Sequence, residues 1–420
     1  MQPLRGTKDI LPHEVTYWQR IYDLVSRILR KNNYHEVRTP ILENTELFLR
    51  TIGDFTDIIN KEMYSFNDQG GRNVTLRPEG TASVARSFIT NKLYLNKKIN
   101  RLWYFGPMFR YERPQKGRQR QFHQLGIECI GSTEAIADAE VIRIAIKIIE
   151  ELRCSKWSLE INAIGNMGER KVYSEALVKY LIQYIDELDN NSRKRLNDNP
   201  LRILDSKETR TQEILTRAPK LNEYLGKESL KHFDELCSYL NEMDISFIVN
   251  KNLVRGLDYY DLTAFEIKSI TNNEENTLCG GGRYNNLIKQ IGGPDTPSVG
   301  WAIGLERLVI ATESTTDIKM NKQQIYLAHF NTRNSNLLWE IIKLIEKYGI
   351  SFELDISGNN LNKQLKRANQ MKCKVCFIIG ESEINNSYVT VKWLETGVQQ
   401  TISTLCVNNY LKYLQYHFRT

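Results

Sequence analysis

The stretch that most constrains the fold is residues 101–130, RLWYFGPMFRYERPQKGRQRQFHQLGIECI. Aromatic and branched apolar side chains favour strands, so we predict a first strand at 102–110 and a second at 122–130. The loop that joins them is dense in arginine and lysine and offers little apolar surface to bury. The segment is therefore predicted to be two strands with a basic loop between them.

The second of these strands has two unlike faces, because successive side chains of a strand point to opposite sides. One face is apolar and the other is not, and the residues alternate in the order Gln124, Leu125, Gly126, Ile127, Glu128, Cys129. Burying Glu128 costs free energy unless a partner accompanies it. Two interpretations stay open from the spacing alone. One is a surface hairpin with a solvated face, and the other is a pocket floor where Gly126 leaves room for a ligand and Arg110 arrives from the neighbouring strand.

The residues of this hairpin resemble a known family. Phe109-Arg110-Tyr111-Glu112, the basic loop and then Arg120-Gln121-Phe122-His123-Gln124 resemble the second signature motif of class II aminoacyl-tRNA synthetases. The longer string ERPQKGRQRQFHQLGIE is similar to the histidyl-tRNA synthetase family within that class. RGLDYY at 255–260 and CGGGRY at 279–284 are similar to two segments specific to that family, although Asn285 stands where many relatives have aspartate.

The resemblance extends over nearly the whole chain and implies its architecture. A helix predicted at 12–32, a strand at 36–39 and PILE at 40–43 resemble the first class II motif, which in the family builds the dimer interface. GWAIGLERL at 300–308 resembles the third motif. The fold class implied is α/β, with an α+β catalytic domain at 1–320 whose antiparallel sheet is flanked by helices. We also predict a strand at 245–250 and a helical insertion at about 165–244.

A polar stretch, ATESTTDIKMNKQ at 311–323, predicts a linker. Beyond it strands and helices alternate, which predicts an α/β domain at 325–420 with a mostly parallel sheet. This domain resembles the anticodon-binding domain of the histidyl, prolyl, threonyl and glycyl synthetases. Lys363, Lys366 and Arg367 on one of its helices either meet phosphates or form a solvated face.

The resemblance implies a histidine site formed by Glu79, Thr81, Arg110, Gln124, Glu128, Arg255, Tyr259 and Tyr260. Glu79 and Gln124 would hold the backbone of the amino acid, with Thr81 supporting Glu79. An ionised Glu128 can only accept a hydrogen bond, whereas Tyr260 can donate one. The pair would therefore match both ring nitrogens of a neutral imidazole.

Two arginines are implied to be catalytic. Arg110 and Arg255 would place fixed positive charge around the α-phosphate of ATP, where alignment and charge stabilisation supply most of the catalysis. From spacing alone, a local ion pair of Arg255 with Asp258 is the less favoured alternative. For Glu79 the less favoured alternative is a position near a helix N-terminus, where a negative charge is stabilised.

The ATP site implied by the resemblance consists of Arg110, Glu112, Phe122 and Arg307, with Phe122 and Arg307 on opposite faces of the adenine. Magnesium would ride on the ATP phosphates, since the sequence shows no dedicated cage of carboxylates and no metal site is expected. The loop would meet the acceptor end of tRNA, mostly through its phosphates, by way of Arg113, Gln115, Lys116, Arg118 and Arg120.

Composition narrows the class of protein. The net charge of +7 is mild for 420 residues, and the odd number of cysteines, seven, argues against a disulfide framework. No apolar run suits a membrane span or a secretory signal, so we expect a soluble cytoplasmic protein.

The activity implied is that of a histidine–tRNA ligase, a homodimer whose other partners are L-histidine, ATP and tRNA(His). One alternative is a non-catalytic synthetase paralogue that regulates histidine biosynthesis. Such proteins usually lack the C-terminal domain and lose catalytic arginines, whereas this chain has both. The other alternative is a different class II synthetase with the same anticodon domain, against which RGLDYY and the pair of Glu128 and Tyr260 argue.

Overall fold

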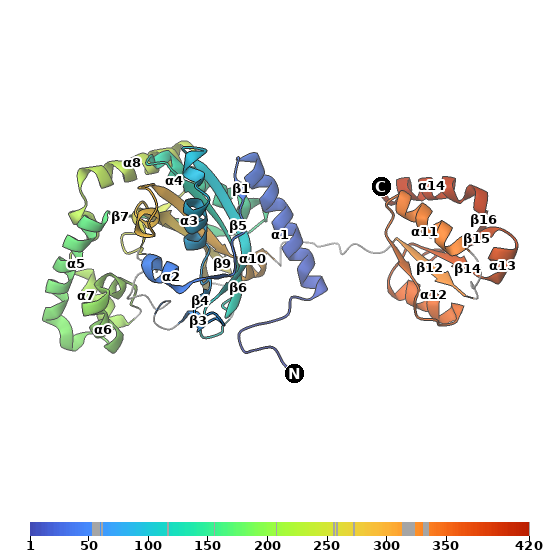
Figure 1. Ribbon diagram of the computed structural model, residues 1–420, viewed down its shortest axis with the longest axis horizontal. Helices are drawn as coiled ribbons and strands as arrows, with labels where there is room; N and C mark the ends of the chain where they lie inside the picture. The colour runs from blue at the N-terminus through green and yellow to red at the C-terminus, as the bar shows by residue number, and fades with distance from the viewer. Residues whose placement is uncertain are drawn as a thin grey trace. The chain divides into compact units, whose positions relative to one another are not determined.

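The computed structural model describes residues 1–52, 59, 62–115, 117–154, 156–206, 208–254, 257, 259–271, 274–312, 324–330 and 336–419. The chain divides into two compact units, Met1–Asp317 and Ile318–Thr420 (Figure 1). Most of the linker predicted at 311–323 lies outside the described residues. No helix in the described ranges combines the length and the apolar content that a membrane crossing requires.

The first unit is built on an eight-stranded sheet in the order β1-β5-β6-β11-β10-β9-β7-β8. The pairs from β5 across to β7 are antiparallel, and the edge strands β1 and β8 pair in parallel. The strands are β1 His35–Glu36, β5 Asn100–Phe109, β6 Gln121–Ile130, β7 Trp157–Gly165, β8 Ile248–Val249, β9 Asp261–Thr271, β10 Glu274–Arg283 and β11 Ser298–Gly304. The antiparallel sheet expected for the catalytic domain is confirmed.

The predicted hairpin is confirmed as β5 and β6, with Leu102 opposite Glu128 and Tyr104 opposite Gly126. Two other strand predictions were too long. The strands expected at 36–39 and 245–250 shrink to the two-residue strands β1 and β8, whose residues are exposed. Both lie at an edge of the sheet, where only one neighbour offers hydrogen bonds and little apolar surface is covered.

Helices α1 (Pro12–Lys31), α4 (Ala135–Glu151) and α8 (Lys227–Glu242) pack on the face of the sheet that carries Leu125 and Ile127 (Figure 1). The apolar stripe predicted for the first helix is confirmed, since Val25 and Leu29 are fully buried. Leu240 of α8 is buried in the same core. The last helix of the predicted insertion therefore packs as part of the main body.

The other helices between β7 and α8 gather at one end of the unit, drawn in green in Figure 1. They are α5 Met167–Leu181, η3 Ile182–Glu187, α6 Asn190–Asp198, η4 Pro200–Asp205, α7 Thr209–Thr216 and η5 Leu221–Tyr224. The helical character predicted for 165–244 is thus confirmed. A capping box fixes the start of α5, where Asn166 accepts from the N–H of Glu169 and Glu169 accepts in return.

The opposite face of the sheet is covered by α3 (Thr81–Thr90), whose Val84 and Phe88 pack against Leu102 and Tyr104. A small sheet in the order β2-β4-β3 leads into this helix. The remaining elements of the unit are β2 Leu42–Asn44, α2 Thr45–Ile52, β3 Tyr64–Asn67, β4 Asn73–Leu76, η2 Leu93–Leu95, α9 Leu287–Gln290 and α10 Leu305–Thr312.

The second unit is an α/β domain on a five-stranded sheet in the order β13-β12-β14-β15-β16. Its elements are β12 Ile325–His329, α11 Leu337–Lys347, β13 Phe352–Leu354, α12 Leu361–Gln370, β14 Val375–Ile379, α13 Glu381–Asn385, β15 Tyr388–Trp393, β16 Gln399–Ser403, η7 Thr404–Cys406 and α14 Val407–Arg419.

The prediction of a mostly parallel sheet for this unit was wrong. β12 pairs in parallel with β13 and β14, but β14–β15 and β15–β16 are antiparallel. The cause is the length of the connections, because a parallel crossover needs about a dozen residues or more. The connection from β14 to β15 holds little more than the short helix α13, and β15 reaches β16 through a tight turn in which Gly397 has φ +73°.

Candidate active site

Four buried tyrosines surround two buried glutamates on the side of the sheet that carries the polar face of β6, and we call this group the tyrosine cage. Its tyrosines are Tyr104, Tyr259, Tyr260 and Tyr284, each no more than 5% exposed, and its glutamates are Glu79 and Glu128, at 3% and 1%. Tyr104 comes from β5 and Glu128 from β6, while the other tyrosines flank the ends of β9 and β10. The polar face is therefore a closed pocket wall, and the surface-hairpin interpretation was wrong.

Glu128 is the centre of this cage. The hydroxyl of Tyr284 donates a hydrogen bond to its Oε2, whereas Oε1 has no hydrogen-bond partner among the described residues. Burial raises the pKa of Glu128 to about 8, against the lowering effect of the Tyr284 and Thr81 hydroxyls. Gly300 opposite it makes the space, since a Cβ there would clash with Oε2. A buried acceptor without a partner is costly in a protein and is a natural place for a polar ligand.

One prediction about this face was wrong. Gly126 was expected to leave room for a ligand, but the ring of Tyr104 fills the space above it. A Cβ at Gly126 or at Gly80 would clash with that ring. The hydroxyl of Tyr104 also has no hydrogen-bond partner in the described part of the chain. The two glycines therefore make room for a phenol of the cage itself.

Tyr259 and Tyr260 close another side of the cage. Their ring centroids lie 4.7 Å apart, and that of Tyr284 lies 5.6 Å from Tyr259 and 6.4 Å from Tyr260. Gly282 permits this packing, because a Cβ there would come within 2.8 Å of Cδ1 of Tyr260. Tyr260 also lines a separate cavity of about 290 Å³ beside the insertion helices. The expected partnership of Glu128 with Tyr260 is thus indirect in this structure, with Tyr284 between them.

Tyr284 is held in place by its neighbour Arg283, whose side chain is fully buried. The guanidinium forms an ion pair with Asp138 of α4 and donates to the carbonyl oxygens of Ser132 and Glu134, at 2.6 Å and 3.0 Å. Asn285 accepts from Arg283 at 3.3 Å, and its amide oxygen also accepts from the N–H of Ser298 at 3.3 Å. Asn285 therefore links Arg283 to the start of β11, a structural role that the sequence pattern did not indicate.

Glu79 lies at the start of α3, and both of its oxygens are engaged by the backbone. They accept from the N–H groups of Thr81 and Ala82, each at 2.7 Å. Burial raises the pKa of Glu79, and these two hydrogen bonds oppose the shift. The Thr81 hydroxyl lowers the pKa of both Glu79 and Glu128, so it lies between the two carboxyls. The helix N-terminus expected as one role for Glu79 is its observed environment.

A cavity of about 350 Å³ adjoins the cage on the same face of the sheet. All four residues predicted to bind ATP line it: Arg110, Glu112, Phe122 and Arg307. Two residues predicted for the histidine site and the tRNA, Gln124 and Arg118, line it as well. The other lining residues are Glu62, Gly117, Gln119, Glu266, Thr277, Leu278, Gly280, Ala302, Gly304 and Glu306. We call it the nucleotide-sized cavity. Gln124, whose buried Oε1 has no described partner, faces it from β6.

The cations of this cavity are fixed by neighbouring groups. Arg110 donates to the carbonyl oxygen of Pro78 at 2.8 Å, and its guanidinium lies 5.2 Å from the ring centroid of Phe122. Arg307 donates to the carbonyl oxygen of Thr277 at 2.9 Å, and burial together with nearby arginines lowers its pKa. Preset guanidinium groups of this kind suit oxygen pairs such as those of a phosphate.

The basic loop folds over one end of the cavity. Arg118 is half exposed, and its Nη1 lies 3.7 Å from Oε2 of Glu112. The other carboxylate oxygen of Glu112, Oε1, lies 3.9 Å from Nη1 of Arg110. Arg120 lies over the ring of Tyr111, 3.7 Å from its centroid. Arg113 and Gln115 are exposed, whereas Lys116 lies outside the described residues.

The catalytic arginine predicted at 255 and its alternative partner Asp258 also lie outside the described residues. Among the residues that sequence reasoning missed, Tyr104 and Tyr284 matter most. Tyr284 ends the CGGGRY string, where attention fell on the glycines. Tyr104 faces Gly126 across the hairpin, and a large side chain opposite a glycine was the available signal.

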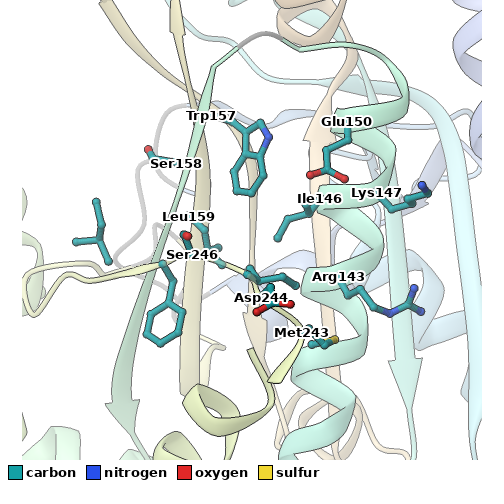
Figure 2. Close-up of a pocket in the computed structure, with 13 residues that line it drawn as sticks. Arg143, Ile146, Lys147, Glu150, Trp157, Ser158, Leu159, Met243, Asp244 and Ser246 are labelled. Atoms are coloured by element: carbon teal, nitrogen blue, oxygen red, sulfur yellow. The ribbon is translucent and has the colours of Figure 1, made fainter. Parts of the chain in front are cut away.

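Another cavity, of about 730 Å³, lies beside α4, and no predicted site residue lines it. Figure 2 shows Arg143, Lys147 and Glu150 on α4, with Trp157 of β7 nearby. Lys147 forms an ion pair with Glu151 at 3.1 Å. The residues that line this cavity include none of the motifs that the sequence singled out.

Comparison with known proteins gives a consistent result. The family described as Histidyl-tRNA synthetase matches residues 6–308, and the one described as Anticodon binding domain matches residues 324–414. The chloroplastic histidine–tRNA ligase of Gracilaria tenuistipitata var. liui is 56% identical over 401 residues, which are 96% of this chain and 95% of that protein. The histidine–tRNA ligase of Cyanothece sp. is 48% identical over 96% of this chain and 94% of that protein. The crystal structure of apo S. aureus histidyl-tRNA synthetase matches with a TM-score of 0.81 at 34% identity, covering 98% of this chain and 100% of that one.

Proposed function

The chain belongs to the histidyl-tRNA synthetase family and charges tRNA with histidine, and from this premise we propose which side chains carry the reaction. In the first step the histidine carboxylate attacks the α-phosphate of ATP, forming histidyl-adenylate and releasing pyrophosphate. In the second step a ribose hydroxyl at the 3′ end of the tRNA attacks the carbonyl carbon, and AMP leaves. The first step needs an imidazole site next to a nucleotide site. We assign the tyrosine cage to the imidazole and the nucleotide-sized cavity to the nucleotide.

The observation that carries the proposal is Oε1 of Glu128, a buried acceptor inside the tyrosine cage for which the described part of the chain supplies no hydrogen-bond partner. An ionised Glu128 would accept the N–H of a neutral imidazole, with Tyr260 donating to the other ring nitrogen. Tyr284 then has a role of its own, because its hydrogen bond favours the ionised form of Glu128. When the wrong amino acid enters such a site, a buried polar group is left without a hydrogen bond. Sites of this kind favour the correct amino acid by ~10⁴ to 10⁵ in kcat/KM.

The remaining histidine contacts are assigned by position. Glu79 and Gln124 would hold the ammonium and the backbone of the amino acid, with Thr81 supporting Glu79. Each oxygen of Glu79 retains a lone pair beyond its backbone hydrogen bond, so it still accepts from an ammonium. Tyr259 would form part of the wall, through its contact with Tyr260.

The nucleotide-sized cavity would hold ATP. Arg110 and Arg255 would stabilise the charge that develops on the α-phosphate, and this preset charge is the main catalytic contribution expected. Phe122 and Arg307 would enclose the adenine, with Glu112 near its amino group. Magnesium would enter on the phosphates, and the carboxylates of Glu112 and Glu266 that line the cavity are of the type that this ion takes.

The tRNA would contact both units. The loop residues Arg113, Gln115, Lys116, Arg118 and Arg120 would meet the phosphates of the acceptor end. The second unit would read the anticodon, as its match to the anticodon-binding family supports. On α12, Lys363 and Lys366 are exposed and available to phosphates.

Assembly and compartment are proposals as well. A homodimer through the segment 12–43 is supported by Ile41 and Leu42, apolar side chains that are 41% and 50% exposed at the start of β2. Sedimentation of the purified protein tests this, and a monomer at micromolar concentration would contradict it. The cytoplasmic location stays a prediction, since a relative named chloroplastic and one from Cyanothece sp. whose name gives no compartment both match over nearly the whole chain.

Amino-acid-dependent exchange of pyrophosphate with ATP tests the proposed function. With each of the twenty amino acids supplied in turn, only histidine should support exchange, and tRNA(His) should then accept the activated group. Exchange driven by another amino acid would contradict the imidazole assignment. Absence of all exchange would favour a non-catalytic paralogue.

A further inference from the structure

The N-terminal segment 4–7 packs against the base of the basic loop. The carbonyl oxygen of Gly6 accepts a hydrogen bond from the N–H of Arg120 at 2.7 Å and a longer one from that of Gln121 at 3.4 Å. Thr7 closes a turn on Leu4, whose carbonyl oxygen accepts the N–H of Thr7 at 2.9 Å and its hydroxyl at 2.7 Å. The segment is therefore an ordered strap across the residues where the loop enters β6.

The fit between this strap and the loop is close at both ends of the loop. Gly6 has φ +86°, a conformation that glycine adopts without strain. A Cβ on Gly6 would lie 2.8 Å from Cγ of Arg120 and 3.1 Å from Cγ of Pro114. Gly6 thus contacts both the first and the last part of the loop, and any side chain at this position would push them apart.

The loop is anchored at two further points. The guanidinium of Arg120 lies 3.7 Å from the ring centroid of Tyr111, and its Nε lies 3.5 Å from the carbonyl oxygen of Glu112. At the tip, the carbonyl oxygen of Gly117 accepts from Nε of Arg307 at 3.4 Å. The base of the loop is also closed by the N–H of Arg110, which donates to the carbonyl oxygen of Arg120 at 2.8 Å, and the strap adds the hydrogen bonds to Gly6 on the other side of this residue.

We propose that residues 4–7 form a clasp that presets the described loop residues 113–115 and 117–120 for tRNA, so that Gly6 is a positioning residue for the transfer step. This inference rests on the proposed function, because it assumes that the loop meets the acceptor end. Ordering a loop on binding costs conformational entropy, and a loop already held in its bound position avoids that cost. The residues that Gly6 contacts, Arg120 and Pro114, line neither the tyrosine cage nor the nucleotide-sized cavity. We therefore expect the clasp to act on tRNA binding and to leave histidine activation unchanged.

The test compares two glycine variants of the full-length protein. Gly6→Ala introduces a Cβ at φ +86° against the loop, whereas Gly71→Ala introduces one at φ +75° with no atom within 4 Å. Both therefore carry similar backbone strain, and only the first presses on the loop. Steady-state histidine charging with varied tRNA concentration, histidine-dependent pyrophosphate exchange and thermal unfolding are measured for both.

For Gly6→Ala the KM for tRNA should rise about tenfold, the size of one lost charge-assisted contact. The rate of histidine-dependent pyrophosphate exchange should be the same in Gly6→Ala and Gly71→Ala. The slope of log KM for tRNA against log salt concentration should fall in magnitude by about one in Gly6→Ala, as expected for one lost phosphate contact. Thr7→Val removes the hydrogen bond from the Thr7 hydroxyl to Leu4 and keeps the one from the backbone N–H. It should raise the KM for tRNA by a smaller factor than Gly6→Ala does.

Equal tRNA KM values for Gly6→Ala and Gly71→Ala would overturn the clasp, and so would an equal loss of exchange and charging in Gly6→Ala. Failure of the wild-type protein to charge tRNA is a different result and would contradict the proposed function. The clasp would in that case be judged by direct tRNA binding to the same two variants, where equal affinities would overturn it.

Discussion

The tyrosine cage and the nucleotide-sized cavity share one face of the sheet but are built in opposite ways. The cage is closed, with Glu128 at 1% exposure, and its carboxylates are held by the Tyr284 hydroxyl and by backbone N–H groups at the start of α3. The cavity is open to solvent at the loop, where the side chain of Arg118 is 50% exposed, and its charges are held by backbone carbonyls and weak ion pairs. Selectivity for an amino-acid side chain needs buried polar groups that cost free energy when they are left unpaired. Binding of a triphosphate needs fixed positive charge, which is effective in a solvated site as well.

The largest expected effect comes from the charge in the cavity. Arg110→Ala should lower the rate of histidine-dependent pyrophosphate exchange by ~10² to 10³, because one lost contact to the developing charge costs about 3 to 4 kcal/mol. Arg255→Ala should do the same. Arg101→Ala is the matched control, since Arg101 lies at the other end of β5 and pairs with Glu140 at 3.2 Å. Near-normal exchange in Arg110→Ala would remove that residue from the catalytic step.

A smaller effect is expected from the cage. Glu128→Gln keeps the shape but cannot ionise, so the KM for histidine should rise by ~10- to 100-fold, in line with about 1.5 to 3 kcal/mol for a hydrogen bond to a charged group. The KM for ATP should stay within a factor of about two of wild type, since the side chains proposed to hold ATP are different ones. A parallel rise in both constants would show that the two regions are not separable.

The pH dependence sharpens the role of Tyr284. Because the pKa of Glu128 is raised to about 8, its ionised fraction increases as the pH rises toward 8, and kcat/KM for histidine should increase with it and then level off. Tyr284→Phe removes a hydrogen bond that lowers this pKa, so the rise should move to higher pH. A shift of one pKa unit means about tenfold less activity at pH 7.

The control for that experiment is Tyr173→Phe, which alters a tyrosine of the insertion helices that is equally buried, at 1% exposure. Its pH profile should overlay that of the wild-type protein. If Tyr284→Phe also leaves the profile unchanged, Tyr284 packs against Glu128 without tuning its charge.

The smallest effect is expected at the adenine. Phe122→Leu keeps an apolar side chain but removes the aromatic face, and it should raise the KM for ATP by ~2- to 10-fold, since such contacts contribute about 0.5 to 1.5 kcal/mol. Phe105→Leu, on the core side of β5, serves as the control because Phe105 packs against the core and does not line the cavity. An unchanged KM for ATP would place the adenine elsewhere.

Sequence patterns predicted the parts of the molecule that depend on local chemistry. The alternation in 122–130 gave the two faces of β6, and the motif around Arg110, Phe122 and Arg307 gave residues that do line one cavity. What the patterns missed depends on contacts between distant segments. Whether Gly126 admits a ligand or a neighbour is decided by Tyr104 on another strand.

The same limit explains the other differences. Tyr284 reaches Glu128 only because β10 and β6 both pair with β11, and neither string alone carries that information. The sheet of the second unit turned out mixed because its connections, not its strands, set the direction. The clasp at Gly6 was not foreseen, because an N-terminal segment with few apolar residues gives no sign of what it contacts.

The central claim is that Glu128 gives up its proton to receive a neutral imidazole. Calorimetric titration of L-histidine at pH 7, in buffers of different ionisation enthalpy, measures the protons released on binding. With a pKa of about 8 in the free protein, the account predicts a release close to one proton per histidine, absent in Glu128→Gln. Equal proton release by the wild-type protein and the variant, or proton uptake by the wild-type protein, would contradict it.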